Sequence, residues 1–73
     1  MTDEQKLEEI ANILEMEADE LNQEMVLDDT GTWDSVAVLS VIAIINEKFN
    51  KFPDSKDILA CNTIGDLMAI MSE

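Results

Sequence analysis

Two adjacent polar residues, Asp34 and Ser35, stand where an irregular acidic segment gives way to a long apolar run. Asp is a preferred N-cap residue, so we expect Asp34 to cap a helix whose first residue is Ser35. A hydroxyl at this position points out of the first turn, beside free backbone N–H groups and the positive end of the helix dipole. Both features stabilise negative charge, so the position suits a covalently attached phosphate ester.

Ser35 is not expected to act as a catalytic nucleophile. A nucleophilic serine normally needs an adjacent base, most often histidine, and this chain contains no histidine. Lysines are few, and the surroundings of Ser35 are acidic. The chain is therefore predicted not to be an enzyme. Taken without its flanking residues, a serine at a helix start would be interpreted simply as part of the cap.

The acidic turn at 28–31 has some features of a calcium-binding loop, but its register is wrong. If Gly31 is the sixth loop position, Val26 is the first and Ala37 the twelfth, where carboxylates are required. No metal site is therefore predicted. Weak, non-specific binding of Mg²⁺ or Ca²⁺ to the crowded carboxylates is still expected, because it relieves their repulsion.

A net charge of −13 predicts that the folded protein is stabilised by screening. Carboxylates held close together repel one another, and both salt and divalent cations weaken that repulsion. Added NaCl or millimolar Mg²⁺ should therefore raise the melting temperature, measured by circular dichroism. A melting temperature that responds to neither addition would contradict this expectation.

The helices that position Ser35 are predicted from apolar spacing, length and capping residues. Thr2 with Gln5, and Thr63 with Asp66, form capping-box patterns. The apolar run after Ser35 is rich in β-branched residues, but its length favours a central helix over a strand. We therefore predict a long ordered loop over residues 18–33, a short third helix capped by Ser55, and helices over residues 3–16, 35–49, 56–61 and 64–72.

These elements predict an all-α fold, a small antiparallel bundle of three principal helices plus one short helix, in a single domain over residues 1–73. Cys61 is the only cysteine, so no disulfide can form within the chain, which is typical of a reducing compartment. The N-terminal residues lack the pattern of a signal peptide, and the longest apolar run is too short to span a bilayer. We expect a cytoplasmic monomer without stable membrane insertion.

Three stretches of the chain together resemble the acyl carrier protein family. Asp34-Ser35-Val36 is similar to the family's Asp-Ser-Leu motif, with Val in place of Leu. The segment at 27–29, Leu-Asp-Asp, resembles the family's leucine-plus-acidic segment before that motif. The segment at 63–67, Thr-Ile-Gly-Asp-Leu, resembles the Thr-Val-Gly-Asp-Leu segment that opens the family's last helix. The resemblance covers nearly the whole chain.

The resemblance implies a prosthetic group and a set of partners. A phosphopantetheinyl transferase (holo-acyl-carrier-protein synthase) would move 4′-phosphopantetheine from coenzyme A onto Ser35, with Asp34 contacting the transferase. The arm would hold acyl groups as thioesters and present them to acyl-activating and acyl-transferring enzymes of fatty acid or specialised acyl biosynthesis. The protein would supply position and a recognisable surface, while the arm carries the bond chemistry.

The resemblance also implies that the helix after Ser35 recognises partners, although this chain departs from the family's usual acidic pattern. No charged residue lies between Ser35 and Asn46. We therefore expect the acidic loop to attract the basic docking surfaces of partner enzymes. The same departure favours a carrier for a specialised acyl pathway. Nucleic acid is excluded as a partner, because its phosphates would be repelled. The predicted partner-binding residues are Asp28, Asp29, Trp33, Val36, Leu39, Ser40, Ala43 and Glu47.

Two other functions remain open at this point. Aminoacyl or peptidyl carrier proteins share the fold but are typically less acidic than this chain. An unmodified acidic module could offer a hydrophobic groove to a basic amphipathic helix, yet most of the methionines fall where a core needs filling. A fatty cargo would need a cavity between helices, which small or pliable side chains permit: Ala37, Ala43, Met68 and Met71.

Overall fold

The computed structural model describes residues 2–71 and shows an all-helical fold. Within these residues no strand is present, and one isolated antiparallel bridge joins Val26 to Thr63. The predicted all-α bundle of three principal helices and one short helix is confirmed. In chain order, the elements are α1 (Asp3–Leu14), the 3₁₀-helices η1 (Ala18–Glu20) and η2 (Leu27–Thr30), α2 (Ser35–Phe49), α3 (Ser55–Leu59) and α4 (Ile64–Ile70).

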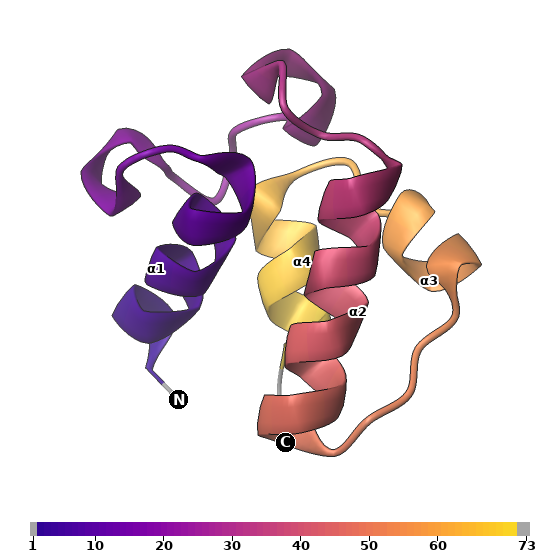
Figure 1. Ribbon diagram of the computed structural model, residues 1–73. Coiled ribbons are helices and arrows are strands. Elements are labelled where there is room, and N and C mark those ends of the chain that lie inside the picture. Colours follow the sequence, from indigo (N-terminus) through magenta and orange to yellow (C-terminus); the bar gives the residue numbers. More distant parts are fainter. Residues whose placement is uncertain (1, 72–73) are drawn as a thin grey trace.

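Helix α2 is the central element of the bundle (Figure 1). α1 lies on one side of α2 and α3 on the other, while α4 lies behind α2 in this view. α1 contacts both α2 and α4, and it runs in the opposite direction to them. The long connection from α1 to α2, which carries η1 and η2, covers the end of the bundle where α2 begins.

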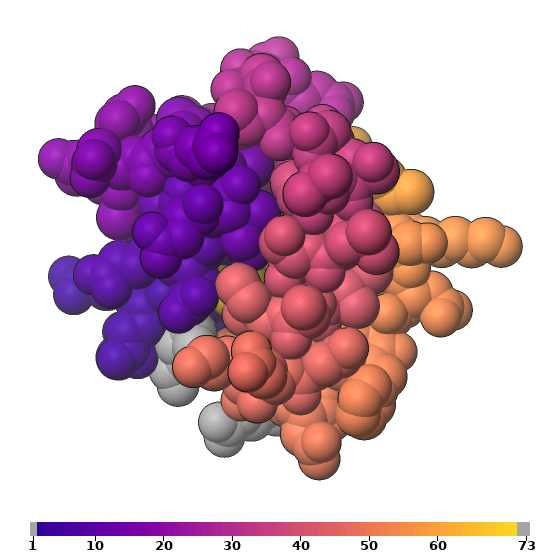
Figure 2. Space-filling view, viewed as in Figure 1, coloured from indigo at the N-terminus to yellow at the C-terminus, as the bar shows by residue number. Residues whose placement is uncertain are grey.

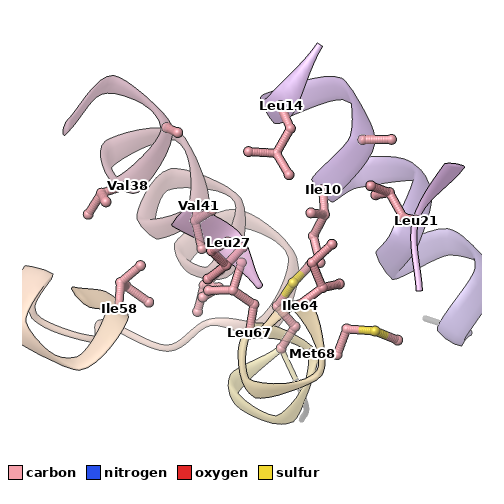
Figure 3. Close-up of a cluster of buried hydrophobic side chains, with 14 of the residues drawn as sticks. Ile10, Leu14, Leu21, Leu27, Val38, Val41, Ile58, Ile64, Leu67 and Met68 are labelled. Carbon is pink, nitrogen blue, oxygen red and sulfur yellow. The ribbon is translucent and has the colours of Figure 1, made fainter. Parts of the chain in front are cut away.

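Aliphatic side chains from all four helices and from the long connection form one buried cluster (Figure 3). Ile58 has no exposed surface and is the buried residue of α3, so it anchors that short helix on the bundle. Full burial of such a side chain contributes about 1.5–3 kcal/mol. The cluster includes Ile10, Leu14, Leu21, Leu27, Val38, Val41, Ile64, Leu67 and Met68.

The predicted end of the first helix was wrong by two residues. α1 ends at Leu14, because Glu15 adopts the left-handed conformation with φ of 59°. The N–H of Met16 then bonds the carbonyl of Ala11 at 2.9 Å, which closes the helix in the manner of a Schellman motif. Glycine usually occupies such a position, so a glutamate there gave no sequence signal of the end.

The short third helix begins one residue earlier than predicted and ends two residues earlier, at Leu59. Ser55 is its first helical residue, and Asp54 is the N-cap. The N–H of Asp54 donates to the carboxylate of Asp57 at 3.1 Å, as in a capping box. α4 ends at Ile70, whereas the predicted end at 72 lies outside the described residues. The predicted loop over 18–33 contains both 3₁₀-helices.

Both predicted capping boxes are present. At the start of α1, Thr2 and Gln5 exchange backbone-to-side-chain bonds of 2.9 and 3.2 Å. At the start of α4, the Asp66 N–H donates to the Thr63 hydroxyl at 3.2 Å, and the Thr63 N–H donates to the Asp66 carboxylate at 3.1 Å. These bonds satisfy donors that the first turn of a helix otherwise leaves free.

The Asp66 carboxylate also accepts the backbone N–H of Asn62 at 3.0 Å. The bonds from Asn62 and then Thr63 hold the pKa of Asp66 below the ordinary value for an aspartate. Because the folded pKa is lowered, the capping contribution is present above the pKa of an unfolded aspartate. It is lost as the pH falls through the folded pKa.

Backbone hydrogen bonds hold the connection between α1 and α2 against the start of α4. The Leu27 N–H donates to the carbonyl of Asn62 at 2.8 Å, and the Ile64 N–H donates to the carbonyl of Met25 at 3.0 Å. The Gly65 N–H donates to the carbonyl of Gln23 at 2.9 Å. These bonds fix the segment that leads into η2 and then into α2.

We expect position 65 to require glycine, because the backbone of Gln23 lies close to it. A Cβ atom at position 65 would lie 3.0 Å from the Gln23 carbonyl oxygen and 3.2 Å from the Gln23 Cβ. In a helix, Gly→Ala alone would stabilise by about 1 kcal/mol, but overpacking against a backbone atom costs about 1–3 kcal/mol. We predict a net loss of stability for Gly65→Ala, measured by urea unfolding.

A matched control is Gly31→Asn, because Gly31 has open space around it and a φ of 78° that asparagine tolerates. Its unfolding free energy should stay within about 1 kcal/mol of wild type. A Gly65→Ala variant more stable than wild type would show that helix propensity outweighs the contact with Gln23.

Candidate functional site

Ser35 is the first residue of α2, and its side chain is exposed. Asp34 has an extended backbone, with φ of −133°, and its carboxylate accepts the backbone N–H of Ala37 at 2.9 Å. The Asp34 carbonyl accepts the N–H of Val38 at 3.0 Å. Asp34 is thus the N-cap, as predicted, and the cap does not depend on the Ser35 hydroxyl.

The turn before Asp34 is held by the side chain of Thr30. Its hydroxyl donates to the carbonyl of Leu27 at 2.8 Å and accepts the N–H of Thr32 at 3.4 Å. Gly31 supplies the left-handed residue that ends η2, with φ of 78°. Leu27 is buried, and its N–H is bonded to the α3–α4 connection. The bonds of Leu27 and Thr30 therefore help to set the position of Ser35 relative to α3.

Two open hollows border the first turns of α2, and Ser35 lines one of them. The hollow on the α3 side has a volume of about 270 Å³, and apolar side chains form most of its wall. It is lined by Ser35, Val38, Leu39, Ser55 and Leu59. The hollow on the α1 side has a volume of about 300 Å³ and includes polar and charged groups; among its lining residues are Ile13, Glu15, Thr32, Asp34, Val36 and Ser40.

A second Asp-Ser pair, Asp54-Ser55, starts α3 and was missed in the sequence interpretation. Ser55 is exposed and lines the same hollow as Ser35. The two sites differ in the next residue and in helix length: Ser35 precedes an apolar valine at the start of a 15-residue helix, whereas Ser55 precedes Lys56 in a helix of five residues. The shorter helix supplies a weaker dipole beside its serine.

Most of the predicted partner-binding side chains are at the surface, and their role in partner binding stays a prediction. Trp33 is half-buried and packs against the core, and Ser40 is half-buried, with its hydroxyl donating to the carbonyl of Val36 at 3.0 Å. The exposed ones are Asp28, Asp29, Val36, Leu39, Ala43 and Glu47.

The four residues that would permit a cavity between helices differ in where they lie. Ala37 is buried, but Ala43 is exposed on α2, so of these two small residues only Ala37 faces the interior. Met68 and Met71 are buried and fill the core. The apolar space that adjoins Ser35 lies instead at the surface between α2 and α3.

Cys61 is half-buried and packs against the core cluster. Partial burial is the main cause that raises the pKa of its thiol, and the carboxylates of Asp66 and Asp57 add to the effect. The thiol is therefore a weak nucleophile at neutral pH, because the thiolate is the reactive form.

Residues 2–71 contain no group of three or more His, Cys, Asp or Glu side chains placed to hold a metal ion. Across the same residues, none of the helices combines the length and the hydrophobicity needed to traverse a bilayer.

Comparison with known proteins gives one match. The family model described as "Phosphopantetheine attachment site" matches residues 7–71, which include every helix except the start of α1. Neither the search of curated proteins nor the search of solved structures found a match. Domains of this family carry a covalently attached 4′-phosphopantetheine, are generally not catalytic, and interact with phosphopantetheinyl transferases and acyl-handling enzymes. The match confirms the resemblance to acyl carrier proteins, and the chain belongs to the family of phosphopantetheine attachment domains.

Proposed function

We propose that this chain is an acyl carrier protein whose 4′-phosphopantetheine is attached to Ser35. The observation that carries the proposal is the exposed Ser35 hydroxyl at the start of the 15-residue helix α2, within a chain that belongs to the phosphopantetheine family. Because Asp34 forms the cap of α2, the Ser35 hydroxyl is not needed for capping. An added phosphodiester would also lie at the positive end of the α2 dipole. This charge–dipole interaction would be favourable by about 0.3–1 kcal/mol.

Attachment requires a transferase, because the chain supplies the acceptor hydroxyl but has no histidine to act as its base. The Ser35 oxygen attacks the β-phosphorus of coenzyme A, and the new P–O bond replaces the bond to the leaving 3′,5′-ADP. The serine proton passes to a base of the transferase. The arm's terminal thiol then carries the cargo as a thioester, and partner enzymes act on that bond.

The hollow beside Ser35 favours an apolar acyl cargo over an aminoacyl cargo. Val38, Leu39 and Leu59 give it an apolar wall, and none of its lining residues is acidic. The ammonium group of an aminoacyl thioester would lose hydration there without gaining a carboxylate partner. A hydrocarbon chain would gain from the same surface.

The proposal extends to partners and location. The exposed carboxylates of Asp28 and Asp29, near the start of α2, suit partner enzymes with basic docking surfaces. The absence of charged residues between Ser35 and Asn46 favours a specialised acyl pathway over the general fatty acid pathway. The single cysteine is consistent with a cytoplasmic location, and we propose that the chain acts as a monomer.

The test is to incubate the purified chain with coenzyme A and a broad-range phosphopantetheinyl transferase, and then to measure the intact mass. A gain of one phosphopantetheine is expected, followed by a further gain when the arm thiol is loaded with an acyl group. An unchanged mass would favour the unmodified acidic interaction module, and loading by amino acids alone would favour the aminoacyl carrier.

A further inference from the structure

Of the two hollows beside the first turns of α2, the one on the α1 side has no role in the proposed function. We call it the α1-side hollow, and the other the α3-side hollow. The α1-side hollow joins the end of α1, through Ile13 and Glu15, to the first turns of α2, through Val36, Ala37 and Ser40. Figure 2 shows α1 and α2 side by side on one face of the molecule, with the connection between them above.

The α1-side hollow adjoins the proposed attachment residue. Asp34 and Val36, which precede and follow Ser35 in the chain, both line it. A group tethered to Ser35 would therefore have a high effective concentration at this hollow, on the order of 1 mM for a short flexible tether. Even a weak contact between the tethered group and the hollow would then be occupied for much of the time.

The two hydroxyl groups that line the α1-side hollow already donate their protons within the fold. The Ser40 hydroxyl donates to the Val36 carbonyl at 3.0 Å, and the Thr32 hydroxyl donates to the Thr30 hydroxyl at 3.5 Å. Toward a ligand, the oxygens of Ser40 and Thr32 can therefore act only as acceptors.

The two carboxylates that line the hollow are acceptors as well. One oxygen of Asp34 accepts the Ala37 N–H at 2.9 Å, which leaves the other oxygen open. Within residues 2–71, no hydrogen bond reaches the Glu15 carboxylate. Such a lining suits an uncharged group with N–H or O–H donors, and it repels a phosphate or a carboxylate.

The 4′-phosphopantetheine arm has this chemistry beyond its phosphate, because it carries two amide N–H groups, a hydroxyl and a pair of geminal methyl groups. We propose that the uncharged part of the arm binds in the α1-side hollow, with its N–H groups donating to Glu15 and Asp34 and its methyl groups against Ile13. This inference rests on the proposed function of Ser35. The α3-side hollow, which has no acidic residue in its lining, stays open for an acyl cargo.

The test compares NMR spectra of the isotope-labelled chain before and after loading, with loading checked by intact mass and coenzyme A removed. Attachment by itself shifts the amide signals next to Ser35, so the informative residues are distant from it in the sequence. Shift changes are expected at Ile13 and Glu15, together with nuclear Overhauser contacts between the geminal methyl groups and Ile13. No comparable change is expected at Ser55 or Leu59, which line the α3-side hollow.

Glu15→Gln should lower the shift change at Ile13 by about half, because a hydrogen bond to a charged acceptor is about twice as strong as one to a neutral acceptor. The matched control is Glu8→Gln, which changes another exposed glutamate of α1 that lines other hollows of the surface. Its spectrum should change on loading as that of wild type does. Both variants should keep the circular dichroism spectrum of wild type, because both side chains are exposed.

Two results would overturn the proposal while leaving the proposed function intact. Shift changes confined to the residues next to Ser35 would show that the arm extends into solvent. Changes at Ser55 and Leu59 without changes at Ile13 and Glu15 would place the arm in the α3-side hollow. If wild type gained no mass on loading, the proposed function and this inference would both fail.

Discussion

Ser35→Ala is expected to abolish the gain in mass on incubation with coenzyme A and a phosphopantetheinyl transferase, while Ser55→Ala gains one phosphopantetheine as wild type does. The substitution at position 35 removes the acceptor oxygen itself, so no residual loading is expected. Ser55 is a demanding control, because it also follows an aspartate, starts a helix and lines the same hollow. Intact mass spectrometry at matched enzyme concentrations provides the measurement.

Loss of loading in Ser35→Ala should not come from unfolding. The cap of α2 is formed by the Asp34 carboxylate and the Ala37 N–H, and alanine is a good helix former at position 35. The unfolding free energy should therefore stay within about 0.5 kcal/mol of wild type, as is usual for exposed sites. A Ser35→Ala chain that still gains the arm would place the attachment on another residue.

The second large effect is expected for Leu27→Ala, which should destabilise the fold by about 2–4 kcal/mol. Leu27 is 1% exposed in the core, and its N–H donates to the Asn62 carbonyl at 2.8 Å. Removing the side chain leaves a cavity and loosens the segment that leads to Ser35. A domain of this size has a total stability of about 4–11 kcal/mol, so a large fraction would be lost. Urea unfolding at neutral pH measures the change.

The matched comparison is Leu39→Ala, because the same side chain is 64% exposed there and leaves no cavity. Its change in unfolding free energy should be within about 0.5 kcal/mol. If Leu27→Ala lost as little unfolding free energy as Leu39→Ala, Leu27 would not be an anchor of the core. We also expect Leu27→Ala to load more slowly than wild type even where it remains folded, because the loop no longer holds Asp34 firmly.

The features predicted correctly from the sequence are those with short-range causes. The bonds between Asp34 and Ala37, and between Thr63 and Asp66, join residues three apart, so the residue types alone indicate them. The central helix α2 was recognised because its apolar run is too long for a strand. The position of Ser35 at the start of α2 was also predicted from the residue types, whereas its role as the attachment site stays a prediction.

The features missed from the sequence depend on distant contacts or on rare backbone conformations. The bridge from Val26 to Thr63 joins segments far apart in the chain, and no local pattern indicates it. The left-handed Glu15 has no sequence signal, because the left-handed residue that ends a helix is usually glycine. The apolar hollow beside Ser35 requires α3 to be placed against α2, and that placement comes from the buried side chain of Ile58.

The most direct test of the account is to locate the arm on the wild-type chain. Cleavage after lysine separates residues 7–48, which contain Ser35, from residues 52–56, which contain Ser55. After loading, we expect the whole gain in mass on the fragment 7–48, and tandem fragmentation should assign it to Ser35. The arm on fragment 52–56, or on another hydroxyl within 7–48, would contradict the assignment of Ser35 as the attachment site.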